Sequence, residues 1–161
     1  YVEIGCYAGG SASLICQRKN TNVFSIDLGT PISPEVPIKN IEKFNIFNNH
    51  YEYIQGNSQK IETLEKLKTF IDDIDVLFID GDHSSNGVKN DFELYSPMVK
   101  NGGYIVFDDY NDYEFSPEVR PMVDHIISTL DGYEIIGTLP NLFKADPESM
   151  LDGNCFIIRK K

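Results

Sequence analysis

Residues 2–11 of the chain read VEIGCYAGGS, a short apolar run that leads into a glycine-rich turn. Val2 to Ile4 has the composition of a strand, and Ser11 can cap a helix that we expect to run to Arg18. Glycines let the backbone approach a ligand closely, and a helix N-terminus offers free N–H groups to an anion. The stretch therefore predicts a strand–turn–helix unit with a ligand-binding turn, although a tight turn without a ligand remains an alternative.

Strand and helix signals alternate along the rest of the chain. We expect strands at 23–26, 51–55, 76–79 and 104–107, helices at 38–49, 58–70, 87–99 and 119–130, and a proline-rich surface loop at 31–37. The run at 76–79 is apolar throughout, which is typical of a central parallel strand covered on both faces. Repeated strand–helix units predict a doubly wound α/β sheet.

Two further strand signals, 133–138 and 155–159, follow one another without an intervening helix. The segment between them, 140–153, is rich in Pro, Asn, Asp and Gly and suits a hairpin loop. We therefore expect the last two strands to pair antiparallel at the end of a mostly parallel sheet.

Composition indicates one compact domain over residues 1–161 and excludes several classes of partner. The net charge of −11 argues against nucleic acid or an anionic membrane surface, since both require clustered Lys and Arg. The three cysteines show no metal-ligand spacing and suit reduced thiols in a cytoplasmic protein. No signal peptide is recognisable, and no apolar run approaches the length of a membrane span.

Polar residues follow the strands at the points where ligands bind in such sheets. Asp27 ends the second strand, about 20 residues beyond the glycines, where a carboxylate can hold a ribose; the alternative is a turn cap. Asn57 could contact an adenine edge, or Ser58 could simply cap the next helix. The glycine spacing departs from the G-x-G-x-x-G fingerprint, which argues against an NAD-dependent oxidoreductase.

Acidic residues follow the fourth and fifth strands. Asp80 and His83 lie in DGDH at 80–83, and Asp108 and Asp109 follow the next strand. Neighbouring carboxylates repel one another unless a cation lies among them, and oxygen ligands suit Mg²⁺ or another hard divalent cation. A histidine beside such a cation suits a general base. The alternative is that the acids cap helices and His83 is a surface residue.

These segments together resemble a known family. The segment 2–11 resembles motif I of class I methyltransferases, which use S-adenosylmethionine (SAM). The segments FIDGDHS at 78–84, GVKND at 87–91 and GGYIVFDDY at 102–110 closely resemble methyltransferase family 24, a group that includes macrolide-sugar O-methyltransferases. The resemblance implies a Rossmann-like, seven-stranded sheet that is mostly parallel with an antiparallel last strand.

The resemblance also implies site roles. The SAM-binding set would be Glu3, Gly5, Gly9, Gly10, Ser11, Asp27, Asn57, Ser58 and Asp80; the metal ligands would be Asp80, Asp108 and Asp109; and His83 would be the base. Relatives carry N-terminal helices that cover SAM and shape the acceptor pocket. Because the chain begins at Tyr1 inside a strand signal, such helices are expected to be missing here.

We therefore expect a SAM-dependent, Mg²⁺-assisted O-methyltransferase that acts on the hydroxyl of a small molecule or sugar. A metal-independent methyltransferase is one alternative. A non-catalytic nucleotide-binding module that retains the fold is another.

Overall fold

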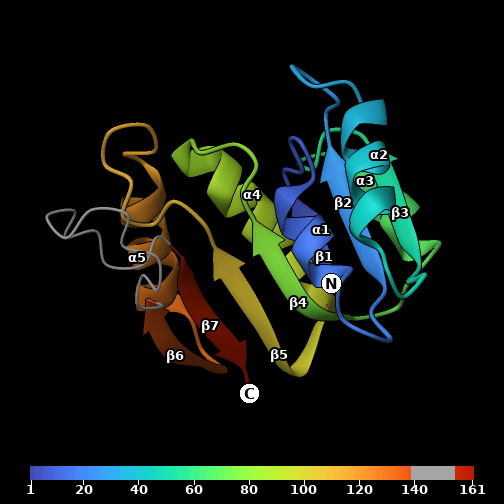
Figure 1. The fold of residues 1–161 in the computed structure, drawn as a ribbon. Coiled ribbons are helices and arrows are strands. Elements are labelled where there is room, and N and C mark those ends of the chain that lie inside the picture. The colour runs from blue at the N-terminus through green and yellow to red at the C-terminus, as the bar shows by residue number, and fades with distance from the viewer. Residues whose placement is uncertain (139–154) are drawn as a thin grey trace, which may run out of the picture.

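The computed structural model describes residues 1–138 and 155–161, which contain one seven-stranded sheet (Figure 1). The strand order is β3-β2-β1-β4-β5-β7-β6. The strands are β1 (Val2–Ile4), β2 (Val23–Asp27), β3 (Tyr51–Gln55), β4 (Ile74–Ile79), β5 (Val99–Phe107), β6 (Tyr133–Thr138) and β7 (Phe156–Lys160). Strands β1 to β5 pair in parallel, and β7 pairs antiparallel with both β5 and β6. The predicted sheet is confirmed, whereas the predicted loop at 140–153 lies outside the described residues.

Helices cover the two faces of the sheet. They are α1 (Gly10–Ile15), α2 (Glu35–Phe44), α3 (Ile61–Lys68), α4 (Ser85–Tyr95) and α5 (Val119–Thr129), with a 3₁₀ turn η1 (Ser96–Met98) after α4. A small core around Cys6, Ala12 and Ile41 lies under α1 and α2. The larger core joins the opposite face of the sheet to α3, α4 and α5. Within the described residues, no helix is long and apolar enough to cross a membrane.

One face of β4 and β5 is only partly covered. Alternate side chains of a strand point to opposite faces, so Leu77 and Ile79 lie in the larger core and are buried. Val76 and Phe78 point the other way and are half-buried, and their neighbour Tyr104 on β5 is 39% exposed. The prediction that this strand is covered on both faces is therefore wrong for one face within the described residues.

Several helix starts differ from the prediction. Ser11 does not cap α1; Gly9 occupies the cap position with a left-handed φ of 83°, and Ser11 lies exposed within the helix. Ser58 does not cap α3, which begins at Ile61 after Lys60. The cap of α4 is Ser84, whose hydroxyl accepts a hydrogen bond from the Gly87 amide at 3.0 Å. A side-chain cap requires the Oγ atom to reach a free amide, and only Ser84 of these three serines does so.

Helix α2 occupies residues 35–44 rather than the predicted 38–49, so it begins inside the proline-rich segment that we expected to be a loop. Pro37 lies in its first turn, where a missing N–H costs nothing because that position has no partner in any helix. The helix ends where Asn45 and Asn49 exchange two side-chain to backbone hydrogen bonds of 2.8 Å. These bonds compete with the helical pattern.

The parallel ladder brings the predicted polar residues to one edge of the sheet. The amide of Asp80 donates to the Ile4 carbonyl at 2.8 Å, and the amide of Asp108 donates to the Ile79 carbonyl at 3.0 Å. The amide of Gly5 likewise donates to the Ile26 carbonyl at 2.9 Å. Each strand end is therefore fixed by its neighbour, at the edge where ligands bind in doubly wound sheets.

Candidate functional site

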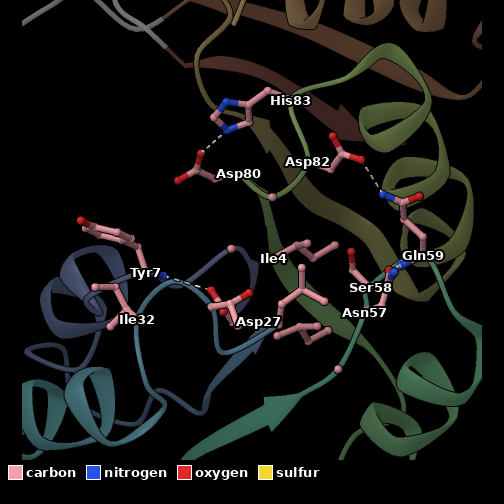
Figure 2. A pocket seen from close by; sticks show the side chains of 16 residues that line it. Ile4, Tyr7, Asp27, Ile32, Asn57, Ser58, Gln59, Asp80, Asp82 and His83 are labelled. Carbon is pink, nitrogen blue, oxygen red and sulfur yellow. Dashed lines mark hydrogen bonds and ion pairs between the residues drawn. The ribbon is translucent and has the colours of Figure 1, made fainter. Parts of the chain in front are cut away.

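A cavity of about 570 Å³ opens at the carboxyl ends of β1, β2, β3 and β4 (Figure 2). Its volume lies in the range of small-ligand pockets. Five of the residues proposed to bind a nucleotide line it, namely Gly5, Asp27, Asn57, Ser58 and Asp80, together with His83. The structure thus brings residues from four strand ends to one cavity.

Gly5 forms the turn at the end of β1, where the chain passes under Asp80. Its φ is +86°, and a Cβ atom there would collide with the carbonyl oxygen of Asp80. Only glycine meets both the steric and the conformational requirement at this position. The close approach at Gly5 is thus to the backbone of Asp80, whereas the sequence led us to expect close approach to a ligand.

Asp27 fixes the conformation of the same turn from the end of β2. Its Oδ2 atom accepts hydrogen bonds from the amides of Cys6 at 2.8 Å and Tyr7 at 3.1 Å, and its Oδ1 atom accepts from Gly29 at 2.7 Å. Figure 2 shows the carboxylate at the cavity wall beside Tyr7. Asp27 therefore acts as a turn cap and lines the cavity at the same time.

The segment after β3 forms another part of the cavity wall. The Oδ1 atom of Asn57 accepts from the amide of Gln59 at 2.9 Å, and the Gln59 Nε2 atom donates to Asp82 Oδ2 at 2.9 Å. The Ser58 carbonyl accepts from the hydroxyl of Tyr95 at 3.0 Å. These bonds hold the loops after β3 and β4 together on this side of the cavity (Figure 2).

The acidic cluster adjoins the cavity, which Asp80 and His83 line, and Asp109 contacts His83 from outside that lining. The Nε2 atom of His83 is 3.2 Å from Asp80 Oδ1, and its Nδ1 atom is 3.4 Å from Asp109 Oδ2. One ligand atom from each of these three side chains lies within 4.8 Å of the others. All three residues are partly exposed, so a cation from solvent can reach them. The donor set of two carboxylates and an imidazole fits a divalent cation.

Both members of the Asp80–His83 pair have raised pKa values. Burial raises the pKa of Asp80, although the hydrogen bond to His83 opposes that change. The hydrogen bond to Asp80 raises the pKa of His83, and burial opposes it. The raised pKa of Asp80 therefore reflects its burial, and the raised pKa of His83 reflects its hydrogen bond to that carboxylate.

Asp108 has a different environment from Asp109. Its Oδ1 atom accepts a hydrogen bond from the Cys155 thiol at 3.1 Å. Its charge nevertheless raises the pKa of both Asp80 and His83, and it lines a small recess that also includes Asp80. Asp108 therefore lies beside the group formed by Asp80, His83 and Asp109 without belonging to it.

Four residues of the predicted SAM-binding set do not line the cavity. Glu3 is buried in the sheet, where its carboxylate accepts from the hydroxyls of Ser25 at 2.7 Å and Tyr1 at 3.2 Å. Gly9 and Gly10 line a shallow groove between α1 and α2, and Ser11 is exposed on α1. The turn that they form reaches the cavity through Gly5 and Tyr7.

Other lining residues had no assigned role in the sequence prediction. They are Ile4, Tyr7, Ile26, Leu28, Thr30, Ile32, Gly56, Gln59, Gly81 and Asp82. Several of them directly follow or precede a predicted site residue, which is the signal that identifies them. The pairing of Gln59 with Asp82 joins positions 23 apart in the chain and has no signal in a single sequence.

A family model described as a methyltransferase domain matches residues 2–110. An uncharacterized protein of Acanthamoeba polyphaga mimivirus is 43% identical over 150 residues, which cover 88% of this chain and 68% of that protein. The family model spans every residue that lines the cavity.

Solved structures share the fold at low sequence identity. An O-methyltransferase from Bacillus cereus in complex with SAH aligns over 99% of this chain and 73% of its own, with 18% identity and a TM-score of 0.73. An rRNA methylase from Streptococcus thermophilus aligns over 99% and 86%, with 10% identity and a TM-score of 0.69. The fold, the cavity and the family match over most of the chain agree: this chain belongs to the family of methyltransferase domains and is a SAM-dependent methyltransferase.

Proposed function

We propose that this domain transfers the methyl group of SAM to the hydroxyl of a small molecule or sugar, with the help of a divalent cation. The observation that carries the proposal is the Asp80–His83–Asp109 cluster, of which Asp80 and His83 line the cavity. A methyltransferase needs a group to deprotonate the acceptor near the methyl donor, and this cluster supplies one. The B. cereus structure, which contains SAH, supports SAM as the donor.

SAM would lie across the strand ends, with its ribose near Asp27 and its adenine near Asn57 and Ser58. The position of Asp27 supports this arrangement, since the residue lines the cavity while its carboxylate accepts from three backbone amides. Gln59, held by Asp82, extends the same wall with a further amide. The residues present therefore fit a nucleoside in this part of the cavity.

Asp80 and Asp109 would hold the cation, and the carboxylate of Asp108 beside them would add to the negative charge of the site. A divalent cation at this position supplies Lewis acidity, which lowers the pKa of a neighbouring hydroxyl. The partly exposed carboxylates are hard oxygen ligands of the kind that Mg²⁺ prefers.

His83 would act as the base. Its Nε2 atom takes the proton of the acceptor hydroxyl, and the hydroxyl oxygen bonds to the methyl carbon as the bond to the sulfonium sulfur breaks. S-adenosylhomocysteine and the methyl ether are the products, so atoms and charge balance. Alignment of the reacting atoms by Asp27, Asn57 and the acidic cluster would contribute a large part of the rate.

We propose a small acceptor rather than RNA, although an rRNA methylase shares the fold. The chain carries a net charge of −11, and the reacting end of the cavity is formed by acids that repel phosphates. The three free cysteines suit the cytoplasmic location that the composition predicts.

One observation favours a metal-independent variant of the same reaction. His83 and Asp80 already form a pair at 3.2 Å, so the carboxylate can orient and charge-stabilise the imidazole without a cation. Chelation separates the two possibilities, because a metal-independent enzyme keeps its rate in EDTA.

The test is methyl transfer from labelled SAM to a panel of hydroxylated small molecules. For an accepted substrate, we expect Asp80→Asn and His83→Ala each to lower kcat by about 100-fold or more, as for loss of a general base. EDTA should abolish turnover, and Mg²⁺ should restore it. Full activity in both variants would contradict the proposed roles.

A further inference from the structure

Tyr7 follows Gly5 and Cys6 in the turn after β1, and its backbone conformation is unusual for its residue type. Its φ is 46°, in the left-handed region. The Gly9 amide closes the turn by donating to the Cys6 carbonyl at 2.8 Å, so Tyr7 is the second residue of a four-residue turn. Glycine, asparagine or aspartate usually occupies that position when φ is positive, because a larger side chain crowds the backbone there. The local conformation therefore disfavours the tyrosine that is present.

The end of β2 imposes this conformation on the turn. The amides of Cys6 and Tyr7 both donate to Asp27 Oδ2, at 2.8 and 3.1 Å. Successive amides converge on one anionic group in turns that combine right-handed and left-handed residues. The positive φ is therefore a property of the turn, and a residue kept there against its preference is a candidate for a role at the site.

The Tyr7 side chain lies at the cavity and not in the core. It lines the cavity, yet it is 66% exposed. A ring with so much exposed surface gains little stability from packing within the protein. The same surface is available to a ligand, and an aromatic ring offers a ligand both apolar area and a π face that carries partial negative charge.

The position of Tyr7 along the cavity indicates which part of SAM the ring would meet. In the proposed arrangement, adenine lies near Asn57 and Ser58 and the ribose lies near Asp27. Figure 2 shows Tyr7 beyond Asp27, on the side away from Asn57 and Ser58. The sulfonium sulfur joins the ribose of SAM to the amino-acid part, so it is the first charged group beyond the ribose. A SAM molecule in this direction would bring its sulfonium toward Tyr7.

We propose that the π face of Tyr7 contacts the sulfonium of SAM and thereby favours the charged methyl donor over its uncharged product. The proposal rests on the proposed position of SAM in the cavity. SAH keeps the adenosine and the amino-acid part of SAM, but its sulfur is a neutral thioether. A cation over an aromatic ring is attracted by the quadrupole of the ring, and a neutral sulfur loses that electrostatic attraction.

This contact gives Tyr7 a role in exchanging product for donor. Transfer of the methyl group removes the positive charge from sulfur, so the attraction to the ring ends when the reaction is complete. The binding free energy that Tyr7 contributes is then specific to SAM and is absent for SAH. Removal of the ring should therefore make the enzyme more sensitive to inhibition by SAH.

The experiment is calorimetric titration of SAM, SAH and sinefungin into the whole protein. We expect Tyr7→Leu to weaken SAM relative to SAH by roughly 3- to 30-fold, the range that corresponds to a cation–π contact. Tyr7→Phe keeps the π face and should keep the wild-type ratio. Sinefungin carries a primary ammonium group where SAM carries its methyl group, and its affinity should follow that of SAM. Asp80 also lines the cavity and attracts cations, so the measured quantity is the change in ratio between variants.

Two further variants control for the fold and for the backbone. Tyr104→Leu is the matched control, because Tyr104 is a partly exposed tyrosine on β5 outside the cavity lining, and it should leave the ratio unchanged. Tyr7→Asn removes the ring and places a residue that tolerates a left-handed φ in the turn. It should lose the preference for SAM and unfold at a higher urea concentration than Tyr7→Leu.

The outcomes separate this proposal from the proposed donor site. An unchanged ratio of SAM to SAH affinity in Tyr7→Leu would overturn the role of the ring and leave the donor site intact. A loss of the ratio in Tyr7→Phe would also overturn it, because the hydroxyl and not the π face would carry the effect. If the folded wild type bound neither SAM nor SAH, the proposed donor site would itself be wrong, and the role of Tyr7 would be overturned with it.

Discussion

The contact between Asp80 and His83 links the chemistry of the site to pH. The two side chains meet at 3.2 Å, and the pKa of each is raised, that of His83 from an ordinary value of 6.5. A cation held by Asp80 would compete with a proton for the same carboxylate. Ligands must lose their protons before they bind a metal, so binding and proton release are coupled.

We therefore expect the affinity for Mg²⁺ to be present above the raised pKa of the pair and to be lost as the pH falls through it. Calorimetric titration in two buffers with different ionisation enthalpies measures the number of protons released. His83→Ala removes one of the two groups that can release a proton and should reduce that number. Equal heats in both buffers for the wild type would show that the cation does not displace a proton at this position.

Some residues of the site were predictable from the sequence, and others were not. Asp27 and Asp80 end strands of a parallel sheet, and the topology alone brings such ends together. The contact between Ser116 and His83 and the Gln59–Asp82 pair depend on how loops fold back over the sheet, which no local pattern encodes. The family resemblance implied a ligand contact for Glu3, and in the structure its carboxylate accepts hydrogen bonds from Ser25 and Tyr1.

The turn between β1 and α1 restricts which residue types can occupy its positions. Gly5 needs both a positive φ and the absence of a side chain, whereas Gly10 has no atom within 4 Å of the position of a Cβ. The structure therefore requires glycine at position 5 and does not require it at position 10. Gly5 makes the cavity wall possible, and Gly10 begins a helix in which alanine is preferred.

Substitution of the two glycines by alanine separates these reasons. We expect Gly5→Ala to lower the free energy of unfolding by at least about 2 kcal/mol, from backbone strain together with the collision with Asp80. Gly10→Ala should leave it unchanged or raise it by up to about 1 kcal/mol. Urea unfolding of both variants measures the difference. Equal stabilities would mean that the turn rearranges without cost.

Helix positions were predictable and helix ends were not. The apolar spacing indicated a helix over 38–49, which overlaps α2 only over 38–44, and the prolines before it suggested a loop. Pro37 is compatible with the first turn, so its presence could not decide between the two. The end at Phe44 depends on the bonds between Asn45 and Asn49, which form only once the chain has turned.

The fold of the whole molecule followed from alternation of strand and helix signals, which leaves few topologies for a single sheet. Periodicity did not reveal the partial cover over Val76 and Phe78, because an apolar strand has the same sequence whether one face or both are packed. The sequence likewise does not show which charged side chains are buried. Composition gives a net charge but does not show that Glu3 and Asp91 are fully buried.

These two buried carboxyls should make the stability of the whole molecule depend on pH. Burial raises the pKa of Asp91 to about 6 and that of Glu3 to about 7. Neither oxygen of Asp91 has a hydrogen-bond partner among the described residues. Because the folded protein binds these protons more tightly than the unfolded chain, stability is greatest near the ordinary carboxyl pKa and falls as the pH rises through the raised values.

Asp91→Asn removes one of these charges and keeps the shape of the side chain. We expect the variant to match the wild type at about pH 4 and to exceed its free energy of unfolding by about 3 kcal/mol at about pH 8. Thermal or urea unfolding across this range measures the difference. Glu3→Gln is the companion variant for the second group. A wild type whose stability does not change over this interval would show that neither carboxyl ionises at a cost in the folded protein.

Calorimetric titration of SAM into the protein is the most direct test of the cavity as a methyl-donor site. We expect saturable binding of one SAM per chain, weakened about 100-fold in Asp27→Ala because the carboxylate orients the turn through three backbone amides. Asp27→Asn keeps one acceptor oxygen and should lose less, and NAD should not compete. Absence of SAM binding by the folded wild type, or binding unaffected by Asp27→Ala, would contradict the assignment of this cavity.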